Sequence, residues 1–451
     1  MTDTIAAIST ALGVGAISII RISGKESLNI VNKITKLKIL EKAKTHTINY
    51  DYIMDQDNII DEVLISVMLA PKTFTKEDTV EINCHGGIAT TNKVLELLLT
   101  NGCRLAEPGE FTKRRFLNGG CDLIEAEGIM DLIKSKTDNA RNLAFNQVNG
   151  NVSKLIKNLR QKILEILANI EVNIDYPEYE DIQEITTSII SEKIKIIEKE
   201  IKDILIKSEN GQIIKDGINL ALIGKPNVGK SSLLNCLLEK NKAIVTDIAG
   251  TTRDCVEGTI ILDGIIINIT DTAGIRQTND IVESIGVNKS KEIIKSADLL
   301  LLLLNANEKL NEEDLNILKD IEKKNHLIVI NKTDLENKID LKDLNVDNIV
   351  YISALNNDGI EELKQKIKKI FHLEKIETED LTYLANARAL SLLRQSLKSI
   401  DDIKIGINNQ MPIDMVGIDL KNIWNLLGNI IGEVYEEELL DQLFSQFCLG
   451  K

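Results

Sequence analysis

The stretch Gly224-Lys-Pro-Asn-Val-Gly229-Lys230-Ser231 decides the fold of the middle of this chain. It follows the apolar run 218–223 and precedes a segment with a helical pattern. Glycines let backbone N–H groups turn toward a phosphate, and the start of a helix adds a favourable dipole. The spacing therefore predicts a phosphate-binding loop, in which Lys230 spans the β- and γ-phosphates and Ser231 binds Mg²⁺.

Two further segments downstream carry the residues that such a loop needs around its metal. Thr251-Thr252-Arg-Asp254 supplies a threonine, Thr252, to complete the Mg²⁺ shell and to sense the γ-phosphate. Asp271-Thr-Ala-Gly274 ends an apolar run, so that Asp271 is expected to reach Mg²⁺ through water and the Gly274 amide to face the γ-phosphate. Their order along the chain indicates a nucleoside triphosphate site.

The last two segments select the base. Asn331-Lys-Thr-Asp334 closes another apolar run, and the Asp334 carboxylate can accept from the two donors on the Watson–Crick edge of guanine. Adenine would leave that charge unpaired, at a cost of several kcal/mol. Ser353-Ala354-Leu355 completes the base pocket through the Ala354 amide. The predicted nucleotide is GTP, and the predicted contacts are Asn227, Val228, Gly229, Lys230, Ser231, Ser232, Thr246, Asp247, Ile248, Ala249, Gly250, Thr251, Thr252, Asp271, Thr272, Ala273, Gly274, Asn331, Lys332, Asp334, Ser353, Ala354 and Leu355.

The residues for the hydrolytic step are unusual. Many related sites place a Gln directly after the Asp-Thr-Ala-Gly element to orient water, and this chain has Ile275 there. Asn227, inside the loop, can hold a monovalent cation where other systems use an arginine finger. Glu283 is the nearest downstream carboxylate that can act through water, although spacing alone favours a solvated charge on a helix face for it.

The apolar runs 218–223, 259–271, 299–305, 327–331 and 349–353 alternate with helical segments. This alternation predicts a doubly wound, mostly parallel α/β sheet of the Ras-like type. Asp263-Gly264 inside the second run is a hairpin signal, which predicts two antiparallel neighbours there.

Helical periodicity flanks this α/β unit on both sides. Val152, Leu155, Leu159, Ile163, Ile166 and Ile170 are expected on one helix face, a helix break is expected at Pro177, and a second helix is expected to end before Asn210-Gly211. Further helices are expected over 386–403, 413–430 and 436–447. The N-terminal part mixes strands, such as 16–22 and 63–69, with helices, such as 91–100.

The predicted fold class is thus α/β plus α. An N-terminal α+β domain (1–118) precedes a helical domain that is split in sequence (119–212 and 379–451) around an inserted G domain (213–378).

Composition narrows the class of protein. The chain has 451 residues and a net charge of −15, which argues against nonspecific binding along a nucleic-acid backbone. Its six cysteines lack C-x-x-C spacing and predict reduced thiols. No apolar run approaches the ~20 residues of a membrane span, and no secretory signal is apparent, so we expect a cytoplasmic protein without a membrane partner.

The sequence resembles the MnmE (TrmE) family of bacterial tRNA modification GTPases over essentially its whole length, and the motifs that carry the resemblance lie outside the predicted G domain. The resemblance rests on Asp3-Thr-Ile-Ala-Ala, Ile20-Arg21-Ile-Ser-Gly24, Glu81-Ile-Asn-Cys-His85-Gly-Gly87, Pro108-Gly-Glu-Phe-Thr-Lys-Arg114, Phe116-Leu-Asn118 and the terminal Phe447-Cys-Leu-Gly-Lys451. It implies that the G domains pair across a homodimer and use K⁺ in hydrolysis. The implied K⁺ ligands are Asn227, Thr246, Ile248 and Thr251, and the implied catalytic residues are Glu283, Asn227 and Lys230.

The resemblance also implies a folate-binding-like N-terminal domain. A 5-formyl- or 5,10-methylene-tetrahydrofolate would be bound by Arg21, Glu81 and Lys451. Cys448 is a candidate for one-carbon chemistry, beside the alternative of packing the last helix. The chain departs from the family pattern at Gly119-Gly120, where a lysine is usual two residues after Phe-Leu-Asn, and at 11–15.

The family works with an FAD-dependent MnmG (GidA)-like partner, in a heterotetramer, to modify carbon five of the wobble uridine of tRNA with a carboxymethylaminomethyl or aminomethyl group. A second hypothesis is a regulatory GTPase of ribosome assembly, of the Era or Der type, that binds rRNA. Such proteins append a compact RNA-binding domain, whereas here the G domain interrupts a helical domain.

Overall fold

The computed structural model describes residues 3–175, 187–240, 258–271, 294–322, 324–340, 348–371, 373, 382–434, 437–448 and 450. The chain divides into two compact units. The first comprises Met1–Met130, Gln147–Glu198 and Leu392–Lys451, and the second comprises Asp131–Asn146 and Lys199–Ser391. The four domain limits expected from the sequence stay a prediction.

The first unit contains a six-stranded sheet in the order β3-β4-β5-β2-β1-β6, in which only β1 and β6 pair in parallel. Alternation of buried and exposed residues along β5 fits a sheet that packs on one face. The predicted strands 16–22 and 63–69 are confirmed as parts of β2 and β4. The strands are β1 (Ile5–Ile8), β2 (Ile17–Ser23), β3 (Thr47–Asp55), β4 (Asn58–Met68), β5 (Thr79–His85) and β6 (Arg104–Leu105).

Short helices complete this N-terminal part: α1 (Ser27–Lys33), the 3₁₀ turn η1 (Leu40–Lys42), α2 (Ile88–Thr100) and α3 (Glu110–Leu117). Val94 and Leu98 of α2 are buried in one core with Ile20 and Ile82 of the sheet. The predicted helix 91–100 is confirmed and begins three residues earlier, at Ile88.

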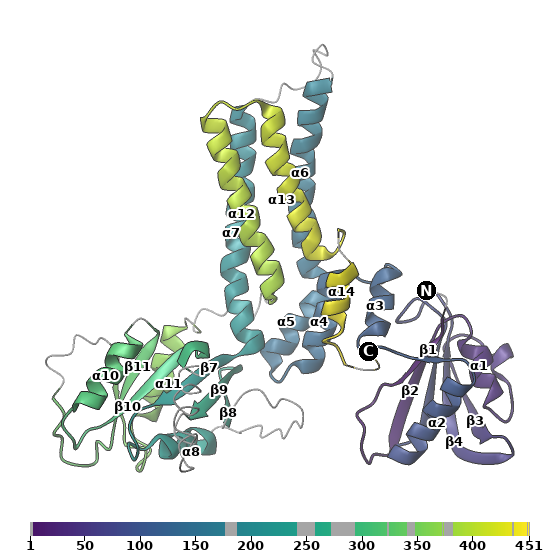
Figure 1. The fold of residues 1–451 in the computed structure, drawn as a ribbon, viewed down its shortest axis with the longest axis horizontal. Helices are drawn as coiled ribbons and strands as arrows, with labels where there is room; N and C mark the ends of the chain where they lie inside the picture. Colours follow the sequence, from purple (N-terminus) through teal and green to yellow (C-terminus); the bar gives the residue numbers. More distant parts are fainter. Residues whose placement is uncertain are drawn as a thin grey trace, which may run out of the picture. The chain divides into compact units, whose positions relative to one another are not determined.

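Helices, most of them long, form the rest of the first unit (Figure 1). They are α4 (Leu123–Lys134), α6 (Asn151–Asp175), α7 (Thr187–Asp216), α12 (Ala387–Asn408), α13 (Ile413–Ile431) and α14 (Glu437–Phe444), of which α4, α7 and α12 extend into the second unit. The Arg160 guanidinium of α6 lies 4.1 Å from the Trp424 ring of α13. The apolar face of α6 is confirmed except at Leu155, which is 37% exposed, because Ile156 fills the buried position instead.

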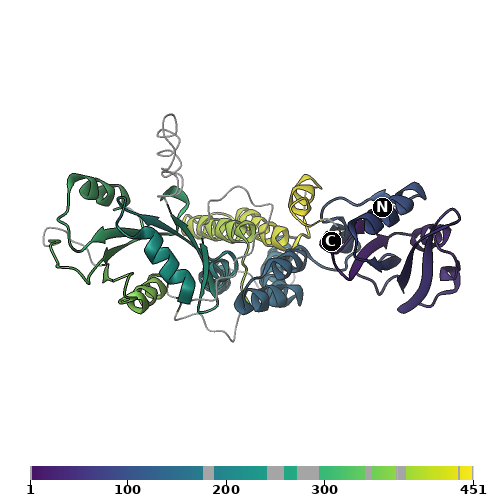
Figure 2. The same cartoon turned by 90° about the horizontal axis from the view of Figure 1, so that it is seen from below.

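The second unit contains the predicted doubly wound sheet, in the order β12-β11-β10-β7-β9-β8. The sheet is drawn in teal and green in Figure 2. Every neighbouring pair is parallel except β8 and β9, whose hairpin turns at Asp263 and Gly264 with φ of 49° and 76°. The strands are β7 (Ile218–Ile223), β8 (Gly258–Leu262), β9 (Ile265–Asp271), β10 (Leu299–Asn305), β11 (His326–Asn331) and β12 (Ile349–Tyr351), and the helices are α5 (Asp138–Val148, whose last two residues lie in the first unit), α8 (Lys230–Lys240), α10 (Glu312–Ile321) and α11 (Ile360–Ile370).

One boundary prediction was wrong. Helix α7 does not end before Asn210-Gly211 but continues to Asp216, and Gly217 ends it with φ of 79°. Gly211 has a packing role inside the helix, since a Cβ there would lie 2.9 Å from the Cβ of Tyr383. Close packing by Tyr383 thus overrides the weak helix propensity of glycine.

Among the helices that the structure describes, none combines the length and the apolar character needed to cross a bilayer.

Candidate functional site

The phosphate-binding loop joins β7 to α8 as the sequence predicts. Gly224 has φ of 142°, and a Cβ there would lie 2.6 Å from the Leu303 carbonyl oxygen of β10. Gly229 has φ of 95°, and a Cβ there would collide with the Asn331 side-chain amide. Both positions therefore require glycine, for conformation and for space.

Lys230, the first residue of α8, turns its ammonium group back over the loop. Its Nζ donates to the carbonyl oxygens of Gly224 at 2.8 Å and Lys225 at 2.7 Å, and the side chain is 5% exposed. A buried ammonium enclosed by the loop is the arrangement that neutralises phosphate oxygens. Ser231 and Ser232 follow on the first turn of the same helix.

The base-selecting segments lie directly against this loop. Asn331, at the end of β11, donates from Nδ2 to the Val228 carbonyl oxygen at 2.9 Å. Its Oδ1 accepts from the Ala354 N–H at 3.1 Å. Lys332 Nζ donates to the Asn227 carbonyl oxygen at 3.0 Å. Three predicted segments are thus brought together.

A cavity of about 620 Å³ opens where these segments meet. Asp334 and Ser353 face each other there, with Ser353 Oγ donating to Asp334 Oδ1 at 2.6 Å. Leu335 and Leu355 are 47% and 83% exposed, so apolar side chains are available to cover a planar base. The lining residues are Gly229, Ser232, Asn235, Cys236, Asn331, Lys332, Asp334, Leu335, Ala354, Leu355 and Asn357.

Sequence reasoning missed Asn235, Cys236, Leu335 and Asn357 of this lining. The thiol of Cys236 contacts the Asn357 side-chain oxygen. Helical spacing could have predicted Asn235 and Cys236, because they lie three and four residues after Ser232 on α8 and therefore on the same helix face as Ser232.

Several predicted residues lie outside the described part of the chain: Thr246, Asp247, Ile248, Ala249, Gly250, Thr251, Thr252, Thr272, Ala273, Gly274, Glu283 and Lys451. Asp271 is described as the last residue of β9, paired with Leu222 of β7, and its side chain lies outside the description. This register places the backbone of Asp271 beside the end of β7, the strand that leads into the phosphate loop.

Two of the three predicted folate residues lie together in the first unit. Arg21 of β2 and Glu81 of β5 are register partners and form an ion pair at 2.8 Å, with side chains 19% and 21% exposed. The Arg21 guanidinium lies 5.5 Å from the Phe74 ring centroid and 5.8 Å from that of Phe111. This pair combines charge and aromatic surface in a partly open site.

The end of the chain reaches the same sheet. The Gly450 carbonyl oxygen accepts from Ser9 Oγ at 3.1 Å, beside β1, whose Ala7 is the register partner of Arg21. Cys448, the candidate for one-carbon chemistry, is exposed, and its carbonyl oxygen accepts from the Gly109 N–H at 3.3 Å.

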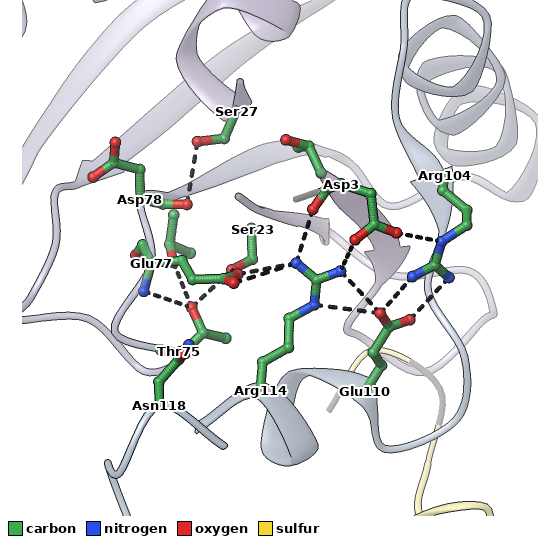
Figure 3. A network of polar contacts seen from close by, with 12 residues as sticks. Asp3, Ser23, Ser27, Thr75, Glu77, Asp78, Arg104, Glu110, Arg114 and Asn118 are labelled. Atoms are coloured by element: carbon green, nitrogen blue, oxygen red, sulfur yellow. Dashed lines mark hydrogen bonds and ion pairs between the residues drawn. The ribbon is translucent and has the colours of Figure 1, made fainter. Parts of the chain in front are cut away.

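A network of charges around the buried Arg114 and Glu110 supports this end of the domain (Figure 3). Arg114 of α3 is 1% exposed and lies within ion-pair distance of Asp3, Glu77 and Glu110. Arg104 binds Glu110 as well, at 2.5 Å. Burial pushes the pKa of Glu110 upward, but hydrogen bonds from Arg104 and Arg114 outweigh it, and the pKa lies below the usual value. The network is structural, since its charges satisfy one another.

The Ras-like sheet, the glycine loop and the Asp334 pocket define a P-loop guanine-nucleotide-binding protein. Two family models cover the chain: the MnmE helical domain matches residues 123–448, and the N-terminus of the GTP-binding protein TrmE matches residues 4–120. The chain belongs to the MnmE family of tRNA modification GTPases.

Curated relatives align over the full chain. The tRNA modification GTPase MnmE of Bacillus subtilis (strain 168) is 52% identical over 100% of both chains. The protein of the same name from Lactococcus lactis subsp. cremoris (strain MG1363) is 50% identical over 100% of this chain and 98% of its own. Among solved structures, the G domain of the T. maritima iron transporter FeoB matches 34% of this chain and 97% of its own at 30% identity, with a TM-score of 0.27, and adds no weight to the assignment.

Proposed function

We propose that the chain is a K⁺-dependent GTPase that acts in the modification of tRNA. The observation that carries this proposal is the pocket at Asp334, joined to the phosphate loop through Asn331, in a chain whose full-length relatives are named tRNA modification GTPases. GTP is bound with Mg²⁺, which Ser231, Thr252 and, through water, Asp271 would hold.

The residues fit a cation-assisted hydrolysis. Asn227 lies in the loop with φ of 64°, its side chain is exposed, and within the described part of the chain it makes no hydrogen bond from that side chain. The Asn227 amide oxygen is therefore available to K⁺, together with Thr246, Ile248 and Thr251. Lys230 neutralises the phosphates, and Glu283 positions water in place of the Gln that Ile275 replaces.

We propose that a larger assembly, of which this chain is one component, modifies the tRNA. The chain acts as a homodimer with an FAD-dependent MnmG (GidA)-like partner, in a heterotetramer located in the cytoplasm. This assembly adds a carboxymethylaminomethyl or aminomethyl group at carbon five of the wobble uridine. The one-carbon unit comes from a tetrahydrofolate bound at Arg21, Glu81 and Lys451, and the ion pair between Arg21 and Glu81 supports that site.

Ribosome assembly of the Era or Der type is the less favoured function. Residues 4–120 match the TrmE N-terminal model and residues 123–448 the MnmE helical model, so the parts outside the G domain support tRNA modification.

The decisive experiment is nucleoside analysis of tRNA from cells that lack this chain. Loss of the carbon-five group at the wobble uridine, restored by the wild-type gene, is expected. Restoration should fail with Glu283→Gln, which blocks turnover, and with Arg21→Gln, which blocks the folate site. Unchanged wobble uridine in the deletion strain would contradict the proposal.

A further inference from the structure

Gly120 departs from the family pattern, and the structure shows what occupies its surroundings. A Cβ at Gly120 would lie 2.9 Å from Cγ of Arg115 and 3.0 Å from its carbonyl oxygen, which also accepts from the Gly120 N–H at 2.7 Å. The Arg115 side chain thus lies over Gly120. A long side chain at 120 and the present position of Arg115 therefore exclude each other.

The Arg115 guanidinium is held at one place by an aromatic ring. Its Cζ lies 5.0 Å from the Phe74 ring centroid. Its Nε is buried without a hydrogen-bond partner, and Arg115 forms no ion pair with any residue that the structure describes. The thiol of Cys121, a poor acceptor, is one polar neighbour of Arg115, and the Glu125 carboxylate interacts with it through charge alone. A buried N–H of a cation without an acceptor is costly, and an incoming anion would remove that cost.

The same ring also lies against the proposed folate site. Arg21 contacts Phe74 as well, at 5.5 Å from its centroid, so the two guanidinium groups share one aromatic neighbour. Arg21 is ion-paired with Glu81, whereas Arg115 has no ion pair among the described residues and interacts with Glu125 only at longer range. A second cation is close: the Nζ of Lys76 donates to the Gly119 carbonyl oxygen at 2.7 Å. Arg115 and Lys76 thus bring two cations to the side of Phe74 on which Gly119 and Gly120 lie.

We propose that Arg115 is a ligand-binding residue of the folate site and binds a carboxylate of the glutamate part of a reduced folate. This inference rests on the proposed folate function and adds a residue to it. The Glu81 carboxylate can accept from the adjacent N–H groups of a pterin ring, and the cation beyond Phe74 is left for the anionic end of the same molecule. In this chain, Arg115 supplies the charge that a lysine at 120 would otherwise bring.

The test is isothermal titration calorimetry of the full-length chain with 5-formyltetrahydrofolate and with 5-formyltetrahydropteroate, which lacks the glutamate. Arg115→Gln should weaken binding of the complete folate by about ten-fold or more, and binding of the pteroate by much less. Arg115→Lys should retain most of the affinity because the charge remains. Lys113→Gln, which removes a positive charge from the same helix, should leave both affinities unchanged.

The double variant Arg115→Ala/Gly120→Lys tests whether a cation at 120 can replace the cation at 115. Alanine at 115 removes the Cγ that would lie 2.9 Å from a Cβ at 120, and the remaining contact of 3.0 Å with the carbonyl oxygen of residue 115 requires a shift of a few tenths of an ångström. Gly120 has no positive φ, so its backbone conformation admits a lysine. Binding should recover relative to Arg115→Ala alone.

Three results would contradict the proposed role of Arg115, and a fourth would contradict the proposed folate function. Equal affinity of wild type and Arg115→Gln for the complete folate, an equal loss for folate and pteroate, or no recovery in the double variant would each overturn the role of Arg115. No binding of either compound to the wild-type chain would instead overturn the folate function itself.

Discussion

Asn331 of β11 donates a hydrogen bond of 2.9 Å to the carbonyl oxygen of Val228 in the phosphate loop. The same amide accepts from the Ala354 N–H at 3.1 Å and is 3% exposed. One buried side chain thus holds the loop that faces the phosphates and the segment that faces the base. Polar groups that satisfy each other in this way fix the relative positions of the loops that carry them.

Asn331→Ala should therefore weaken guanine nucleotide binding through both loops at once. The change leaves the Val228 carbonyl and the Ala354 N–H without partners, at about 1–3 kcal/mol for each buried group. We expect GDP affinity to fall by on the order of ten- to a hundred-fold in a fluorescent-nucleotide titration.

Asn305→Ala is the matched control. Asn305 ends β10 directly beside Asn331 in register and is similarly buried, but its amide donates to Glu308 and not to the loop. Equal losses in the two variants would mean that the strand ends matter only for folding of the sheet.

Asp334→Asn should change which base is bound. The carboxylate accepts from two donors of guanine, whereas an amide offers one donor and one acceptor. We expect weaker binding of GTP and improved binding of xanthosine triphosphate, whose base carries a carbonyl where guanine has its amino group. Competition titrations with both nucleotides measure the ratio. A variant that still binds only GTP would show that Asp334 does not contact the base.

Replacing K⁺ by Na⁺ should slow GTP turnover by at least about ten-fold and leave GTP binding intact, because the cation that we propose at Asn227 would stabilise charge that develops during hydrolysis. Phosphate release measured in each salt, with nucleotide affinity measured in parallel, separates the two effects. Asn227→Ala should turn over slowly in both salts. Equal wild-type rates in K⁺ and Na⁺ would contradict the cation assignment.

Short-range signals in the sequence predicted the strands of the second unit. Asp263-Gly264 specifies its own turn, since two consecutive positive φ values are needed there and these residue types adopt them. The glycines of the phosphate loop and the apolar strand β10 are equally local, and β10 occupies the predicted residues 299–305. Local chemistry decides these elements, so a single sequence suffices to place them.

Features that depend on packing between distant residues were not predictable. Asn210-Gly211 indicates a helix end in the sequence, but Tyr383, which is distant in sequence, packs against Gly211 inside the helix.

Some contacts join residues that are distant in sequence. Cys236 and Asn357 come into contact in the base pocket because the sheet brings their segments together. The network at Arg114 joins Asp3, Glu77 and Glu110 from separate segments, and no spacing in the sequence indicates it. Arg21 and Glu81 came from a family resemblance, and strand register then supplied the reason for their contact.

The Arg114 network makes the N-terminal domain sensitive to acid. Hydrogen bonds from Arg104 and Arg114 hold the pKa of Glu110 below its ordinary value despite burial, and a hydrogen bond from Arg104 likewise lowers the pKa of Asp3. A carboxyl group with a depressed folded-state pKa stabilises the fold above its unfolded-state pKa and loses that contribution as the pH falls through the folded-state value. Protection of residues 104–117 from hydrogen exchange, corrected for intrinsic rates, should therefore decline below about pH 4.5.

Glu110→Gln tests the origin of this decline. At neutral pH the variant should lose about 1–3 kcal/mol of protection in residues 104–117, because the arginines lose a charged acceptor that is 4% exposed. The difference from wild type should shrink as the pH falls, since the wild-type carboxylate is then protonated as well. Glu107→Gln, a change at an exposed carboxylate of the same loop, should follow the wild-type profile. A constant difference between Glu110→Gln and wild type across the whole pH range would mean that packing, and not charge, gives Glu110 its effect.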